Sequence, residues 1–143
     1  MNTNNVNAAE IEKFSQHASE WWNEQGPLKT LHQINPTRVQ WIAQHAQLAG
    51  AKTLDIGCGG GILSEALARE GALVTALDMA EDSIDIAREH AKISQLEIDY
   101  QAVTAEAWAE AHPESYELIT CMELLEHVPD PASVIHADRK SVV

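Results

Sequence analysis

A glycine-rich segment near the middle of the chain carries the residues best placed to bind a ligand. Glycines at alternate positions, Gly57, Gly59 and Gly61, follow a short apolar run that contains Asp55 and ends at Ile56. Apolar residues then recur at helical spacing, so the pattern predicts a strand, a tight turn and a helix. Glycine permits positive φ and lets a backbone approach a ligand where a Cβ would collide. Because open α/β sheets bind ligands at the carboxyl ends of their strands, this turn is the first candidate site.

A second acidic residue, Asp78, ends the next apolar run, residues 72–77. An acid roughly 20 residues beyond such glycines suits the two hydroxyls of an adenosine ribose. The alternative is that Asp78 caps the helix that follows, but Asp82 and Ser83 could cap that helix equally well. We therefore interpret Asp78 as the ribose ligand.

The spacing of the glycines separates two classes of nucleotide ligand. The dinucleotide fingerprint G-x-G-x-x-G requires its third glycine where this chain has Ile62, which makes an NAD-binding dehydrogenase domain the weaker alternative. The pattern D-x-G-x-G-x-G, from Asp55 to Gly61, instead resembles the first motif of class I S-adenosylmethionine (SAM) methyltransferases. SAM carries a ribose and no pyrophosphate.

Titratable side chains form a second cluster just after the last predicted strand: Glu123, Glu126 and His127. Two carboxylates and an imidazole can bind a divalent metal, for which Mg²⁺ is the natural choice, or can act as acid and base. Glu123 and His127 are the candidate catalytic residues, since an unperturbed imidazole titrates near neutrality. The spacing supports equally well a role in which Glu126 and His127 only hydrogen-bond the turn.

Alternating apolar runs predict how these residues are positioned. Strands are expected at residues 52–56, 73–77, 96–103 and 116–122. Helices are expected between them, at residues 62–70, around residues 84–93 and at residues 105–111. Such alternation predicts an α/β fold, with a Rossmann-like, doubly wound and mostly parallel sheet and right-handed connections.

A helical region, residues 8–49, is expected to precede the sheet, after a disordered stretch at residues 1–7. Its first helix carries Trp21 and Trp22, which cannot both face one core stripe. One is expected to pack on the domain while the other covers a pocket or a neighbouring segment. An ordinary helix anchored by one bulky residue is the alternative.

The second helix of this region is expected to follow a loop at residues 29–36. Asn35 would cap the helix and Pro36 would occupy its first turn. Arg38 then lies where a cation opposes the helix dipole, which makes sense if the guanidinium pairs with a carboxylate. A solvated surface arginine is the plainer interpretation.

Length and composition narrow the class of protein. The chain has 143 residues, enough for one domain, and a formal net charge of −13, which argues against nucleic acid and against strong docking on anionic lipid. Two cysteines indicate no disulfide framework. No signal peptide or apolar run of transmembrane length is present, so a cytoplasmic protein is expected. Peripheral contact with a membrane is compatible with this composition.

Taken together, several motifs resemble one family, the ubiquinone-biosynthesis O-methyltransferases. The resemblance runs from about Phe14 to Ala137. The motifs that carry it lie at residues 21–22, 31–38, 54–63, 77–79 and 120–131. The glycine loop is common to many methyltransferases, whereas the paired tryptophans with Asn-Pro-x-Arg and the segment Cys-Met-Glu-x-x-Glu-His are more specific.

The resemblance implies a SAM site and a reaction. The SAM-binding residues would be Arg38, Asp55, Gly57, Gly59, Asp78 and Met122. The methyl group would pass from the SAM sulfonium to a phenolic oxygen of a polyprenyl catechol or demethylubiquinol. Contact with the inner membrane or with a complex for ubiquinone synthesis would suit such a substrate. A phenol has a pKa near 10, so its proton must leave. A metal held by Glu123, Glu126 and His127 would lower that pKa, and His127 or a nearby acid would receive the proton.

The resemblance also implies a longer chain. After Pro131 the family continues through a helix and three more strands, whereas residues 138–143 match nothing expected there. A truncated domain that lacks the last strands is therefore expected. A SAM-binding fragment without activity is the non-enzymatic alternative that follows.

Overall fold

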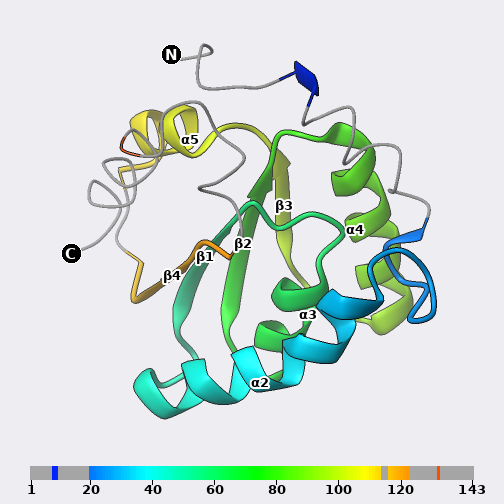
Figure 1. Ribbon diagram of the computed structural model, residues 1–143. Coiled ribbons are helices and arrows are strands. Elements are labelled where there is room, and N and C mark those ends of the chain that lie inside the picture. The colour runs from blue at the N-terminus through cyan, green and yellow to red at the C-terminus, as the bar shows by residue number, and fades with distance from the viewer. Residues whose placement is uncertain (1–7, 10–19, 114–115, 123–131, 133–143) are drawn as a thin grey trace.

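Four parallel strands form the centre of the computed structural model, which describes residues 8–9, 20–113, 116–122 and 132 (Figure 1). The strands are β1 (Lys52–Ile56), β2 (Leu73–Asp78), β3 (Asp99–Ala102) and β4 (Leu118–Thr120). Their spatial order is β3-β2-β1-β4. The parallel, doubly wound sheet predicted from the alternation of apolar runs is confirmed.

The register brings the carboxyl ends of three strands to one edge of the sheet. Ile56 of β1 pairs with Leu77 of β2, and Asp55 pairs with Thr120 of β4. The two outer strands are shorter than the predicted ranges 96–103 and 116–122. Within the described sheet each outer strand pairs on one side only, and β3 enters the ladder at Asp99, so pairing begins later than the apolar pattern suggests.

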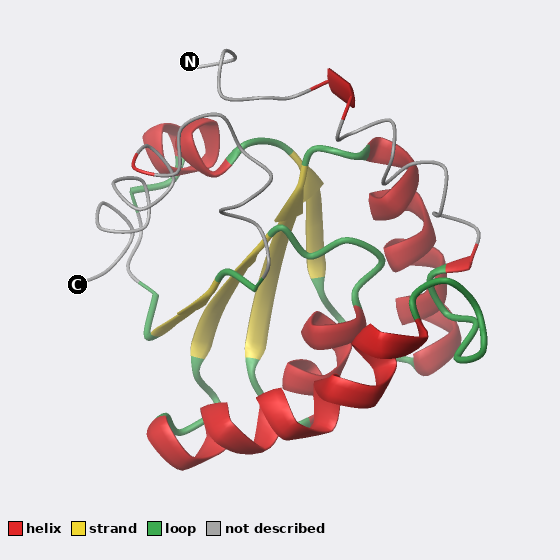
Figure 2. Cartoon of the chain, viewed as in Figure 1, coloured by secondary structure: helices red, strands yellow, loops and turns green. Residues whose placement is uncertain are grey.

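Four described helices cover the two faces of the sheet: α2 (Lys29–His45), α3 (Ile62–Arg69), α4 (Glu81–Ser94) and α5 (Ala105–Ala111). One core cluster joins α2, α3 and α4 to one face of the sheet, and a second joins α5 to the other face (Figure 2). Neighbouring residues of β2 belong to different clusters: Ala76 lies in the first and Leu77 in the second. This is the two-fold alternation of a strand buried on both faces. None of the described helices is both long enough and apolar enough to cross a membrane.

Helix α2 begins seven residues earlier than the sequence suggested. The predicted loop at residues 29–36 is wrong, because the helix runs through Pro36 from Lys29. An interior proline costs about 3 kcal/mol, since it lacks an N–H and crowds the preceding turn. Packing of Ile42 and Val39 against the core offsets this cost. Asn35 is not a cap; its side-chain amide donates to the Ile62 carbonyl at 3.3 Å and fastens α2 to the start of α3.

Candidate functional site

The glycine loop, residues 57–61, is anchored to the end of β2. The amides of Gly57 and Cys58 both donate to the Leu77 carbonyl, at 2.8 and 3.0 Å, and the Gly61 amide donates to the Cys58 carbonyl at 3.1 Å. The turn needs positive φ, 73° at Gly57 and 92° at Gly61, which side chains rarely tolerate. The loop is therefore a fixed backbone surface at the carboxyl end of the sheet.

Asp78 ends β2 directly beside this loop. Its Oδ2 accepts the Gly59 amide and its Oδ1 accepts the Ala80 amide, each at 2.8 Å. Burial raises the pKa of the Asp78 carboxyl, while these two amide bonds act in the opposite sense. The residue at the N-cap of α4 is Ala80, which has no side-chain cap, so the capping alternative for Asp78 is wrong. A carboxylate held in this way at the edge of the sheet is a hydrogen-bond acceptor of fixed orientation.

Asp55 lies beneath the loop and does not reach its surface. Only 2% of the residue is exposed. Its Oδ2 accepts the Ser64 hydroxyl at 2.6 Å and its Oδ1 accepts the Thr120 hydroxyl at 2.8 Å. Burial raises the pKa of Asp55 to about 6, against the effect of these two bonds. The direct SAM contact expected for Asp55 is therefore replaced by a positioning role: the side chain ties β1 to α3 and β4.

Arg38 and Met122, the other two predicted SAM-binding residues, lie on other elements. Met122 follows β4, is half-buried and packs against the core cluster that contains α2, α3 and α4. Arg38 is half-buried on α2, one turn beyond the Asn35 side chain that binds the first residue of α3. The sheet thus brings Gly57, Gly59 and Asp78 together directly. Met122 lies just after the neighbouring strand β4, and Arg38 lies on α2, the helix that packs on α3.

The predicted metal and catalytic cluster lies outside the described residues. Glu123, Glu126 and His127 all fall in the range 123–131. Among the residues that the structure describes, no three His, Cys, Asp or Glu side chains come close enough to hold a metal ion. Neither cysteine is part of a disulfide, and burial keeps the pKa of the Cys58 thiol well above its usual range, so this thiol is neutral.

Two tryptophans cover the glycine loop. The sequence predicted that one of them would pack on the domain and the other would cover a pocket or a neighbouring segment. Trp21 is buried, and its ring lies so close that a Cβ added to Gly59 or Gly60 would sit 2.4 Å from it. Trp22 donates its indole N–H to the Gly60 carbonyl at 2.9 Å. Two adjacent residues of a helix point in different directions and could not both face the loop. Trp21 and Trp22 do so because residues 21–28 form turns and not a helix, so both rings can face the loop.

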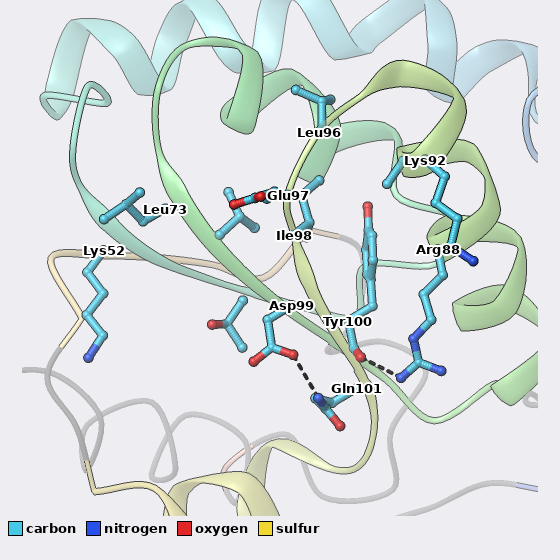
Figure 3. Close-up of a pocket in the computed structure, with 13 residues that line it drawn as sticks. Lys52, Leu73, Arg88, Lys92, Leu96, Glu97, Ile98, Asp99, Tyr100 and Gln101 are labelled. Atoms are coloured by element: carbon cyan, nitrogen blue, oxygen red, sulfur yellow. Dashed lines mark hydrogen bonds between the residues drawn. The ribbon is translucent and has the colours of Figure 1, made fainter.

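An open cavity of about 730 Å³ lies elsewhere on the molecule (Figure 3). It is lined by the first residues of three strands, Lys52, Leu73 and Asp99, and so lies toward the amino-terminal ends of the sheet. Arg88 reaches into this region and donates to the Tyr100 carbonyl at 2.7 Å. None of the residues assigned above to a SAM site lines this cavity.

A strand that ends in a fixed carboxylate beside a glycine loop at the edge of a parallel sheet is typical of nucleoside-binding α/β domains. The methyltransferase-domain family matches residues 53–139 of this chain, which therefore belongs to that family. The chain is 57% identical over 133 residues to a protein from Stutzerimonas stutzeri and 53% identical over 137 residues to one from Methylococcus capsulatus. Each of these relatives is named ubiquinone biosynthesis O-methyltransferase.

The alignments cover 93% and 96% of this chain and 57% and 58% of those relatives. The chain thus spans less than three fifths of their length. Such relatives favour the methyltransferase interpretation over the NAD-binding one.

Solved structures confirm the Rossmann-like methyltransferase fold. Magnesium protoporphyrin IX methyltransferase from Synechocystis, with bound SAM, aligns with a TM-score of 0.77 at 21% identity, over 96% of this chain and 74% of its own. A structure described as a DhpI-SAM-HEP complex aligns with a TM-score of 0.73 at 17% identity, over 100% and 64%. At these identities the likeness establishes the fold alone.

Proposed function

We propose that this chain binds SAM at the glycine loop and Asp78, as part of an O-methyltransferase of ubiquinone biosynthesis. The acceptors would be phenolic hydroxyls of polyprenyl catechol and demethylubiquinol intermediates. The names of relatives at 53–57% identity support the acceptor class. The single observation that carries the donor site is the Asp78 carboxylate, held by the Gly59 and Ala80 amides at the end of β2.

The residues at this edge fit a nucleoside with an amino-acid tail. Asp78 would accept hydrogen bonds from the ribose hydroxyls. Arg38 would pair with the carboxylate of the methionyl group, for which a guanidinium offers two parallel hydrogen bonds. Gly57 would let the backbone approach the ligand, Gly59 would hold the Asp78 carboxylate through its amide, and Met122 would line the adenine and sulfonium region. Bound SAM would supply an electrophilic methyl group.

The acceptor side of the proposal rests on residues outside the described part of the chain. A phenol must lose its proton before its oxygen can attack, and its ordinary pKa is near 10. His127 is proposed to receive that proton, with Glu123 as the neighbouring acid. Glu123, Glu126 and His127 are also the proposed ligands of a Mg²⁺ ion. Because a polyprenyl chain is apolar, we propose that a cytoplasmic enzyme meets this small-molecule substrate at the surface of the inner membrane.

Removing the Asp78 carboxylate tests the donor site. Hydrogen bonds to a charged group contribute about 1.5–3 kcal/mol, so we expect Asp78→Ala to weaken SAM binding by about tenfold to a hundredfold. Asp78→Asn keeps one acceptor oxygen, so its SAM affinity should lie between those of Asp78→Ala and the unchanged protein. The measurement is titration calorimetry of SAM into the 143-residue chain.

Asp82→Ala is the matched control, because Asp82 is an exposed acid in the first turn of the adjacent helix α4. Its SAM affinity should equal that of the unchanged protein. Since Asp78 also holds two amides, thermal unfolding must be recorded for every variant. Equal affinity in Asp78→Ala and the unchanged chain, with both folded, would disprove the donor site.

A further inference from the structure

Trp22 fastens the turn segment before α2 to the glycine loop. Its indole N–H donates to the Gly60 carbonyl at 2.9 Å. Its ring stacks on the imidazole of His90 in α4, with centroids 3.5 Å apart and planes inclined by 3°. The edge of the same ring meets His32 of α2, whose Nε2 lies in hydrogen-bond contact with the Trp21 carbonyl at 2.7 Å. Three separate segments therefore hold one indole in place.

A buried carboxylate fixes the imidazole on which Trp22 stacks. His90 Nδ1 lies 2.6 Å from Oε2 of Glu65, and Glu65 is fully buried in α3. The other oxygen of Glu65 accepts the Arg69 guanidinium at 3.0 Å. A buried carboxylate is costly unless cationic or hydrogen-bonding partners satisfy it, so Glu65 has little freedom to move. A continuous path of contacts thus runs from α3 through α4 and Trp22 to Gly60.

The ring of Trp21 packs directly on the glycine loop. Because Trp22 is bound to Gly60, the adjacent Trp21 ring lies across Gly59 and Gly60 and leaves 6% of the residue exposed. Its indole N–H is buried and has no hydrogen-bond partner among the described residues. The outer face of the glycine loop is therefore covered by an aromatic ring and shielded from water at these two positions.

We propose that Trp22, supported by the Glu65–His90 pair, is a positioning residue that holds the glycine loop in its binding conformation before any ligand arrives. This inference rests on the proposed function, because the loop is the proposed donor site. A ligand that meets a preformed loop does not lose affinity to the ordering of that loop. Trp22 need not touch the ligand to affect its affinity.

Amide hydrogen exchange without ligand tests this positioning directly. Two loop amides are reporters: Gly59, bonded to Asp78, and Gly61, bonded to the Cys58 carbonyl. Trp22→Phe removes the N–H donor and keeps an aromatic ring over His90. One lost hydrogen bond corresponds to about fivefold, so both amides should exchange about fivefold faster. Amides of β2 in the sheet should be unchanged, and SAM affinity should fall by about the same factor.

Trp41→Phe is the matched control, because Trp41 also stacks on a histidine, His45, but is 58% exposed on α2. It should change neither the loop amides nor SAM affinity. Glu65→Gln, which keeps the shape of the side chain and removes its charge, should accelerate the same two amides. In a double variant with Trp22→Phe, Glu65→Gln should accelerate the exchange of these amides little further, since both substitutions act through one path of contacts.

Unchanged exchange at Gly59 and Gly61 in Trp22→Phe would overturn the positioning role, as would equal acceleration of the β2 amides, which would indicate general destabilisation. Because these measurements use no SAM, they are separate from the donor site. Local acceleration in a chain that never binds SAM would support the positioning of the loop and refute the proposed function.

Discussion

Gly60→Ala is expected to destabilise the protein by about 1–3 kcal/mol, the usual cost of an extra methyl group in a packed site. The new Cβ would lie 2.4 Å from Cγ of Trp21 and 2.6 Å from its Cβ. These atoms are close to the backbone of Trp21, so they cannot swing away as the tip of a flexible side chain can. The loss should appear as a lower urea midpoint without a change in the dependence on urea.

A double-mutant cycle with Trp21→Gly identifies the cause, because glycine removes both Cβ and Cγ of Trp21. Trp21→Gly alone leaves a cavity and should cost at least the about 3–5 kcal/mol of a full tryptophan truncation. In the double variant nothing at position 21 meets the new methyl group, so the two separate costs should sum to clearly more than the measured loss. If the two losses of stability were strictly additive, a clash with Trp21 would not be the reason why Gly60→Ala is destabilising.

Gly50→Ala is the control for this cycle. Gly50 has a φ of 76° and nothing within 4 Å of an added Cβ. Its substitution should therefore cost only the conformational penalty of about 1–2 kcal/mol for a side chain in the left-handed region. That cost should be the same with tryptophan or with glycine at position 21.

Asp55 should make the protein less stable as the pH rises from about 4 to about 6. Burial raises the pKa of Asp55 to about 6, above the unfolded value of 3.8. Between these values the folded state holds a proton that the unfolded state has released, so its stabilising contribution is complete below pH 4 and lost through pH 6. A difference of about two pKa units corresponds to about 3 kcal/mol.

Asp55→Asn removes this titration while leaving an oxygen to accept the Thr120 hydroxyl. The Ser64 hydroxyl can rotate and accept from the new amide. We therefore expect the free energy of unfolding of the variant to increase relative to that of the unchanged protein as the pH rises. At pH 8 it should match or exceed that of the unchanged protein. Urea unfolding from pH 4.5 to pH 8 measures the difference.

Comparing each variant with the unchanged protein cancels the titration of groups that do not interact with the substituted residue. Asp82→Asn, at an exposed position, should give a curve parallel to that of the unchanged chain. A parallel curve for Asp55→Asn as well would show that Asp55 has an ordinary pKa in the fold.

Local pattern was sufficient for much of the sheet. The strand Lys52–Ile56 and the helix Ala105–Ala111 have the bounds that the sequence predicts. Both are short apolar segments bounded by strong turn residues, so neighbouring residues decide where they end. The glycine loop was found in the same way, because its conformation is specified by the glycines themselves.

Other parts of the site depend on contacts that spacing along the chain cannot reveal. Pro36 predicted a helix start, yet packing against the core carries α2 through it. Asp55 belongs to a motif whose acid was expected to face a ligand, but burial turns it toward Ser64 and Thr120. The bond from Trp22 to Gly60 joins residues 38 positions apart, and no local period reports such a contact.

The pairing of β1 with β4 has a consequence for the order in which the protein folds. The bond from Thr120 to Asp55 joins residues 65 positions apart, whereas the glycine loop binds Asp78 across 19. Closing a longer loop costs more chain entropy and slows the step that requires it. The unit from β1 to β2, with the Asp78 carboxylate in place, is therefore expected to assemble early. The edge that carries Met122 joins it late.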